Sequence, residues 1–215
     1  CDLYMLSLTE ALGSPANVNA QHWVLPFGDL DLSSNPAEHI WHGYELTDFR
    51  PTARLTVNGV KNIYSHMGLG EPLAAIPHVD GRAPSSFTVT DKLRIPVSLF
   101  MEIPDPRRQV LSDHISGHLT LTALDDQGHI LIANKTPIPL QYDQTASRAL
   151  SLSNAVDWSS EYKGFLDGRF FDNGRKPQLI AIEPHRYGCI PVVLVHGTAS
   201  SPGRWADMVN DLLED

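Results

Sequence analysis

The sequence predicts an α+β protein in which a β-rich region precedes a short α/β segment, and two patterns carry this prediction. Residues 116–124 alternate between apolar and polar side chains, as a strand with one buried face does. Residues 192–195 are a continuous apolar run, which is typical of a strand covered on both faces in a parallel sheet. Small residues and an amphipathic segment follow that run, so a strand–loop–helix unit is expected there.

The 215 residues divide into four expected regions. Residues 1–13 are interpreted as the end of an upstream helical region, 14–157 as a β-rich accessory domain, 158–177 as a linker and 178–215 as the start of an α/β domain. A chain that opens inside a helix without an initiator methionine is expected to be a fragment. Cys1 and Cys189 are expected to stay unbridged, because the whole β region separates them.

The formal net charge is −9, and this balance excludes some classes of partner. Binding to nucleic-acid phosphates requires clustered lysine and arginine. The 16 basic residues are scattered instead, and the adjacent pairs Arg107–Arg108 and Arg175–Lys176 are interpreted as solvated surface. No apolar run approaches the ~18 residues of a membrane-spanning helix. We therefore expect no nucleic-acid binding and no transmembrane segment in this chain.

Two helices are expected outside the C-terminal segment. The first covers residues 1–12, is ended by Gly13, and places four apolar side chains on one stripe: Tyr4, Leu8, Ala11 and Leu12. The second covers residues 143–152, with the side chain of Asp143 or Thr145 as its N-cap.

Residues 50–140 are expected to form one antiparallel β unit. At its start, residues 54–57 alternate in polarity and are followed by Asn58–Gly59, a dipeptide favoured in hairpin turns. Residues 61–64 would then pair back onto the first strand.

Two further stretches complete the unit. Residues 93–102 alternate in polarity, and Pro96 indicates an edge position or a bulge. Residues 116–124 are expected to turn at 125–128 and to pair with residues 129–133. The inward side chains of the longer strand would be Leu119, Leu121 and Ala123.

The C-terminal segment is expected to contain strands at residues 178–183 and 192–195, then a helix that begins near Pro202 with Ser201 as its cap. Apolar residues recur there at helical spacing and are predicted to face inward: Trp205, Met208, Val209, Leu212 and Leu213. The polar residues between them are predicted to face water: Arg204, Asp207, Asn210, Asp211 and Glu214.

Two pairs of histidines are candidate metal ligands. The pairs His39–His42 and His114–His118 are close in sequence, but a zinc site needs three or four ligands of matched geometry. No cysteine or third histidine stands at a ligand-like spacing. Neither a metal nor a cofactor is therefore expected.

The stretch Ile190–Leu213 resembles the α/β-hydrolase superfamily, specifically its bacterial lipase- and esterase-like serine hydrolases. The likeness rests on the apolar run, on His196–Gly197 and on Ser201–Pro202 before the amphipathic segment. Three further parts are similar to large bacterial α/β-hydrolases with an added N-terminal region: residues 1–4, residues 60–64 together with 68–73, and residues 182–184 leading into 191–197. The resemblance implies that residues 178–215 begin the catalytic domain and that Cys1 lies mid-protein.

The same resemblance implies cleavage of carboxylic esters by acyl transfer, with an ester or lipid as the substrate of the full-length protein. The backbone N–H of Thr198 would take the first oxyanion-hole position, supported by His196 and Gly197. In this superfamily the nucleophile, acid and base follow later in the chain. None of them is expected in these 215 residues, which would be inactive alone.

Two alternatives stay open. An α/β-hydrolase with an aspartate nucleophile, of the dehalogenase or epoxide hydrolase type, would share the same strand–loop–helix start. A non-catalytic binding module would instead use the β-rich region as its functional part. The sequence leaves the localisation open, and a bacterial cell-envelope location is compatible with the resemblance.

Overall fold

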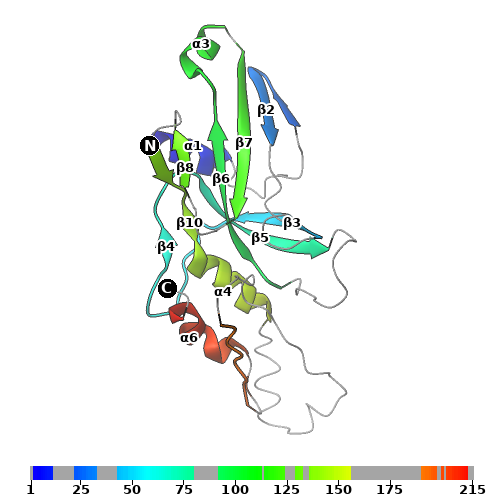
Figure 1. Cartoon of the computed structure of the whole chain (residues 1–215), viewed down its shortest axis with the longest axis vertical. Coiled ribbons are helices and arrows are strands. Elements are labelled where there is room, and N and C mark those ends of the chain that lie inside the picture. Colours follow the sequence, from blue (N-terminus) through cyan, green and yellow to red (C-terminus); the bar gives the residue numbers. More distant parts are fainter. Residues whose placement is uncertain are drawn as a thin grey trace.

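The protein is a mixed α+β structure built mostly from one curled β-sheet (Figure 1). The computed structural model describes residues 2–11, 22–32, 43–79, 92–112, 114–123, 129–132, 136–155, 190–197, 200 and 202–212. Several expectations lie outside these residues: the helix stop at Gly13, the Cys1–Cys189 separation, the linker 158–177, the strand 178–183 and the cap Ser201. In the described part of the chain, no helix combines the length and apolarity needed to cross a membrane.

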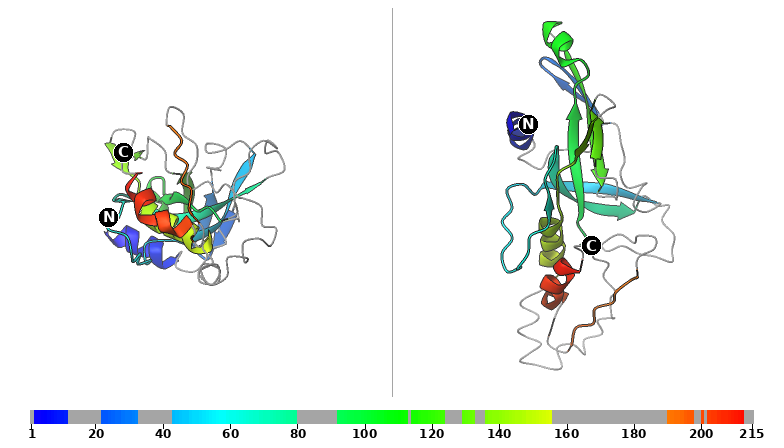
Figure 2. Two further views of the ribbon diagram at one scale, coloured as in Figure 1. Left: turned by 90° about the horizontal axis from the view of Figure 1, so that it is seen from below. Right: turned by 60° about the vertical axis from the view of Figure 1, so that its left-hand side comes forward.

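The main sheet has six strands, which run across it as β1 (His22–Leu25), β2 (Gly28–Leu32), β7 (Ile115–Ala123), β6 (Ile95–Glu102), β5 (Glu71–Val79) and β3 (Tyr44–Pro51). All neighbouring strands are antiparallel except β2 and β7, which pair in parallel. Figures 1 and 2 show β6 and β7 rising together as a long arm, with the β1–β2 hairpin beside it.

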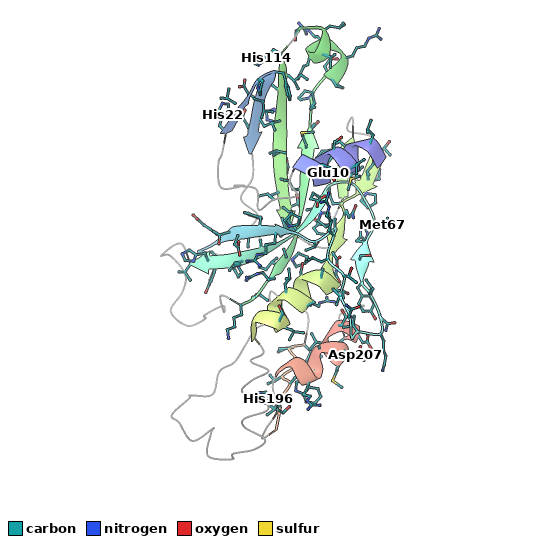
Figure 3. All side chains as sticks on the ribbon, turned by 180° about the vertical axis from the view of Figure 1, so that it is seen from behind. Glu10, His22, Met67, His114, His196 and Asp207 are labelled. Atoms are coloured by element: carbon teal, nitrogen blue, oxygen red, sulfur yellow. The ribbon has the colours of Figure 1, made fainter. Side chains whose placement is uncertain are left out.

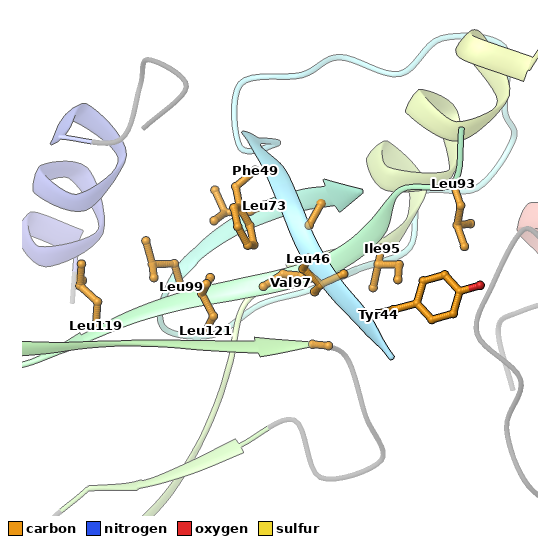
Figure 4. Packing of buried hydrophobic residues seen from close by; sticks show 12 residues of the cluster. Tyr44, Leu46, Phe49, Leu73, Leu93, Ile95, Val97, Leu99, Leu119 and Leu121 are labelled. Atoms are coloured by element: carbon orange, nitrogen blue, oxygen red, sulfur yellow. The ribbon is translucent and has the colours of Figure 1, made fainter. Parts of the chain in front are cut away.

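One face of the sheet carries the hydrophobic core (Figure 4). Strand side chains alternate between the two faces, so Leu119, Leu121 and Ala123 all point inward and are buried, as the sequence predicted. Val97 and Leu99 of β6 meet them and are fully buried. Within the expected range 50–140, β5, β6 and β7 are antiparallel neighbours, but β4 (Ser65–His66) and the pair of β8 (His129–Ile132) with β9 (Thr136–Pro139) belong to separate two-stranded sheets, so the range does not form one antiparallel unit.

The expected edge position of Pro96 is wrong, because β6 lies between β5 and β7 in the middle of the sheet. Pro96 is the second residue of β6 and stands opposite Ala74 of β5. Among the described residues, the pairing of β6 with β7 runs from Val97, opposite Ala123, to Glu102, opposite His118.

The expected partner of residues 116–124 is also wrong. Strand β7 pairs with β6 on one side and with β2 on the other, whereas β8 (His129–Ile132) pairs with β9 (Thr136–Pro139). Strand β6 offers a longer partner, with eight residues of which the first five are buried, whereas β8 has only four residues. Gly28 makes the other side possible, since a Cβ there would lie 1.6 Å from the carbonyl oxygen of Ile115.

The expected hairpin between residues 54–57 and 61–64 does not form. Asn58–Gly59 does turn, with Gly59 at a φ of 90°, but the chain on both sides of it is not strand. After Thr52, whose N–H donates to Pro72 O, the chain leaves the sheet. Residues 61–64 run instead toward the C-terminal helix, and then β4 (Ser65–His66) pairs with β10 (Tyr142–Asp143).

Both expected helices form. In α1 (Asp2–Ala11), Leu8 is buried and the hydroxyl of Tyr4 accepts from Met101 N (2.8 Å) and donates to Met101 O (3.1 Å). In α4 (Gln144–Ala155), Oδ1 of Asp143 accepts from Ala146 N at 2.8 Å, so Asp143 is the N-cap. The other helical elements among the described residues are α3 (Pro106–Leu111), the 3₁₀ turn η2 (Pro202–Trp205) and α6 (Ala206–Asp211).

Candidate functional site

The apolar run 192–195 is not a buried strand, which corrects the sequence prediction. Residues 190–197 contain no strand, and Val195 is 78% exposed while Ile190 is 88% exposed. No strand pairs with this segment among the residues that the structure describes. A strand of a parallel sheet needs hydrogen-bonded neighbours and covering layers, and this segment has neither within the described ranges.

The residues that were expected to form the oxyanion loop come directly after this run in the sequence. His196 is exposed, and its Nδ1 lies 3.3 Å from the carbonyl oxygen of Gly197, so Nδ1 is the donor in this contact. Gly197 does not use the positive φ that only glycine tolerates, and a Cβ there would meet nothing within 4 Å. Thr198 lies outside the described residues, so the direction of its N–H stays a prediction. The described residues therefore do not assemble an oxyanion hole.

The helix expected near Pro202 does form, as η2 followed by α6. Its orientation differs from the prediction: Val209 is buried, but Met208 and Leu212 are about half exposed, and Asn210 is only 2% exposed. A polar residue expected to face water is thus the most buried side chain of α6. The reason is a set of hydrogen-bond partners that the local pattern does not reveal.

Asn210 lies at the centre of a buried hydrogen-bond network. Its Oδ1 accepts from the hydroxyl of Thr145 (3.0 Å), and its Nδ2 donates to Asn62 O (2.7 Å). The Thr145 hydroxyl in turn accepts from Tyr64 N at 2.8 Å. Because each buried polar group has a partner, the network fixes one arrangement of the three segments at little cost.

Two acidic residues of α6 complete the contact with the same segment. Asp207 Oδ1 accepts from Lys61 N (3.0 Å), while Asp211 Oδ1 accepts from Asn62 Nδ2 (3.0 Å) and from the Tyr64 hydroxyl (3.3 Å). We call residues 61–64 the cradle. The cradle and α4 together hold α6 in a defined place on the β-rich part of the protein (Figures 1 and 3).

A shallow, open hollow lies beside the cradle. Its lining combines charged and apolar side chains: Lys61, Arg204, Asp207, Asp211, Trp205, Met208 and Leu212. Lys61 Nζ lies 3.5 Å from Asp207 Oδ2, so these two side chains form an ion pair. Among the residues that the structure describes, no three His, Cys, Asp or Glu side chains gather in a way that would hold a metal ion.

Sequence analysis missed the cradle as a site. The similarity to large hydrolases pointed to residues 60–64, but it assigned them no role. A local signal was present, since three residues of the cradle carry side chains that hydrogen-bond or form ion pairs. Their partners lie about 150 positions later in the chain, for example Asp211 for Asn62, and no local period reports such a contact.

Comparisons of the chain with protein-family models, with curated proteins and with solved structures find no match.

Proposed function

We propose that this chain supplies the accessory β region and the oxyanion-loop segment of an α/β-hydrolase that cleaves carboxylic esters. The observation that carries the proposal is the seating of α6. The helix starts at Pro202, a few residues after His196–Gly197, and the cradle and α4 then hold it by hydrogen bonds from Asp207, Asn210 and Asp211.

The proposed chemistry is acyl transfer to an activated nucleophile. The N–H of Thr198 would donate to the oxygen that becomes negative as the carbonyl is attacked, and such a donor works best when it is fixed beforehand. Fixing α6 limits where the loop before Pro202 can lie. On this proposal the β-rich region positions the catalytic loop from outside the catalytic domain.

Three features of the described residues limit the proposal to a contribution. The segment 190–197 is exposed and contains no strand. No serine in the chain stands in a G-x-S-x-G elbow. By the superfamily's chain order, a catalytic histidine follows the nucleophile, so His196 is not the base. The nucleophile, acid and base would come from sequence beyond the motif at residues 190–213.

The test compares two proteins in a short-chain ester assay: this 215-residue chain and the product of the complete reading frame that encodes it. The proposal expects turnover only from the latter, blocked by a serine-directed phosphonate. It also expects Asn210→Ala in that product to lower kcat by loosening the oxyanion loop. Phosphonate-sensitive turnover by the 215-residue chain, or no ester turnover by either protein, would contradict the proposal.

A second candidate is a non-catalytic binding module, and one observation favours it. The sheet buries its core with residues of β3, β5, β6 and β7, without any residue of 190–197. The core of the sheet therefore forms without side chains from the described part of the hydrolase-like segment. Complete absence of a nucleophile elbow from the encoding reading frame would support this candidate over the first.

A further inference from the structure

The outer end of the β6–β7 arm carries exposed apolar side chains that the proposed function does not use. We define the tip as Phe27 in the β1–β2 turn together with Arg107, Arg108, Val110 and Leu111 of α3. No residue of α3 is buried, and Leu111 is 80% exposed. Figure 2 shows α3 at the very end of the arm. Exposed apolar side chains gathered at one end of a molecule commonly mark an interaction site.

Hydrogen bonds hold the two parts of the tip together. Ile115 N donates to Phe27 O at 2.8 Å, which joins the β1–β2 turn to the start of β7. Gln109 fixes α3 from both ends of its side chain, since Nε2 donates to Pro104 O (2.6 Å) and Oε1 accepts from Ser116 N (2.7 Å). The helix is therefore held by polar contacts, and its apolar side chains remain directed away from the core.

Size and shape favour a lipid surface over a protein partner. A stable protein–protein interface uses roughly 20–30 residues on each side, whereas the tip offers three apolar side chains at the end of a narrow arm (Figure 1). A few apolar side chains flanked by arginine suffice for shallow insertion, because bilayer lipids rearrange around them.

Charge gives the second argument. Arg107 and Arg108 are an adjacent pair of exposed cations in a chain whose net charge is −9. Asp105 precedes α3 and Asp113 follows it in the sequence, while Asp29 of β2 is already paired with His114 at 3.2 Å. Among the described residues, no acidic side chain forms an ion pair with Arg107 or Arg108. The two guanidinium groups are thus placed to meet phosphates of anionic lipid headgroups while the apolar side chains enter below them.

We propose that the tip is a shallow anchor for an anionic lipid surface. Phe27, Val110 and Leu111 enter the boundary between headgroups and acyl chains, about 5–10 Å deep, and Arg107 and Arg108 bind the headgroup phosphates. This site lies at the opposite end of the molecule from His196 and Asp207 (Figure 3). It goes beyond the proposed function, and neither depends on the other.

The experiment is flotation of the 215-residue chain with two kinds of vesicle, phosphatidylcholine alone and phosphatidylcholine mixed with phosphatidylglycerol. We expect binding to the anionic vesicles that weakens with added salt. Val110→Ser with Leu111→Ser should lower the bound-to-free ratio at least about tenfold. Arg107→Gln with Arg108→Gln should lower it on anionic vesicles alone, by about fivefold for each arginine.

Ile63→Ser is the matched control, because Ile63 is 65% exposed but belongs to the cradle at the other end of the molecule. It should bind vesicles as the unchanged chain does. All these positions are exposed, and circular dichroism confirms that each variant is folded. Failure to bind either vesicle, binding that the tip variants leave unchanged, or a dimer that the Val110→Ser, Leu111→Ser variant dissociates in size-exclusion chromatography would each overturn the proposal. Ester turnover has no part in these outcomes.

Discussion

The sheet and the segment 190–197 contain the same kinds of side chain in opposite environments. Leu99 of β6 is fully buried between β5 and β7, while Val193 is 66% exposed with no strand beside it among the described residues. Both sequences read locally as strand. An apolar run therefore specifies a strand only together with neighbouring strands that supply hydrogen bonds and with layers that cover its faces.

The largest effect is expected in the core of the sheet. Leu99→Ala removes a fully buried side chain that packs against β7, and the cavity should destabilise the protein by about 2–5 kcal/mol. Urea unfolding followed by circular dichroism measures this. A loss below 1 kcal/mol would mean that β6 is not the centre of the core; the exposed Leu55→Ala serves as the control.

The next effect concerns the seat of α6. Asn210→Ala leaves the Asn62 carbonyl without its donor and the Thr145 hydroxyl without its acceptor, at a cost of about 1–3 kcal/mol. We expect the loss to be local. Hydrogen exchange should accelerate in residues 206–211 and 61–64 while the amides of β6 and β7 stay protected. Equal acceleration in the sheet would show that α6 and the sheet unfold as one unit, and Met208→Ala provides an exposed control on the same helix.

A smaller effect depends on pH. Burial raises the pKa of Asp143 above its usual value, and the hydrogen bond from Ala146 N opposes that rise only in part. Because the folded pKa is raised, protonation of the Asp143 carboxyl group favours the folded state. This contribution to stability is full below the unfolded pKa and is lost as pH rises through the folded pKa. Asp143→Ala should cost about 1 kcal/mol through the lost cap.

Asp143→Asn separates the cap from the charge. It keeps an oxygen acceptor for Ala146 N but does not ionise, so its stability relative to the unchanged protein should increase as pH rises from acid to neutral. Thermal unfolding at several pH values measures the difference. A difference that is independent of pH would show that the carboxyl of Asp143 is not destabilised by burial.

The smallest effect completes the comparison. Val193→Ser changes an exposed side chain with no strand partner in the described chain, and we expect a change within about ±0.5 kcal/mol. Val97→Ser, the matched change in β6, should cost several times more because Val97 is fully buried. A similar loss in both variants would indicate that residues 190–197 are packed in solution.

Local sequence patterns correctly predicted several features that neighbouring residues specify. Alternation identified the inward residues of β7, and residue type at a helix start identified Asp143 as the cap of α4. Tyr4 and Leu8 lay on the expected buried stripe of α1. In each of these cases the sequence signal lies within a few positions of the chain.

Pairing was not predictable in the same way. The partner of β7 was expected at residues 129–133, the next strand in sequence, but burial and length favour β6. The parallel β2–β7 contact depends on the close approach at Gly28, which no alternation reports. Asn210 was assigned to water because polarity was its only local signal, although its partners Asn62 and Thr145 make burial favourable.

The seat of α6 also sets an order of assembly. Its contacts join residues 61–64 to residues 207–211, whereas the strands of the main sheet and α4 are all synthesised by Ala155. Long sequence separation delays such contacts during folding. At synthesis rates of about 5–20 residues per second, several seconds pass between the synthesis of Ala155 and that of Asp211. The sheet can therefore form before α6 is available to bind the cradle. Until then water serves the backbone groups that α6 later binds, and a nascent chain would show a protected sheet and an open cradle.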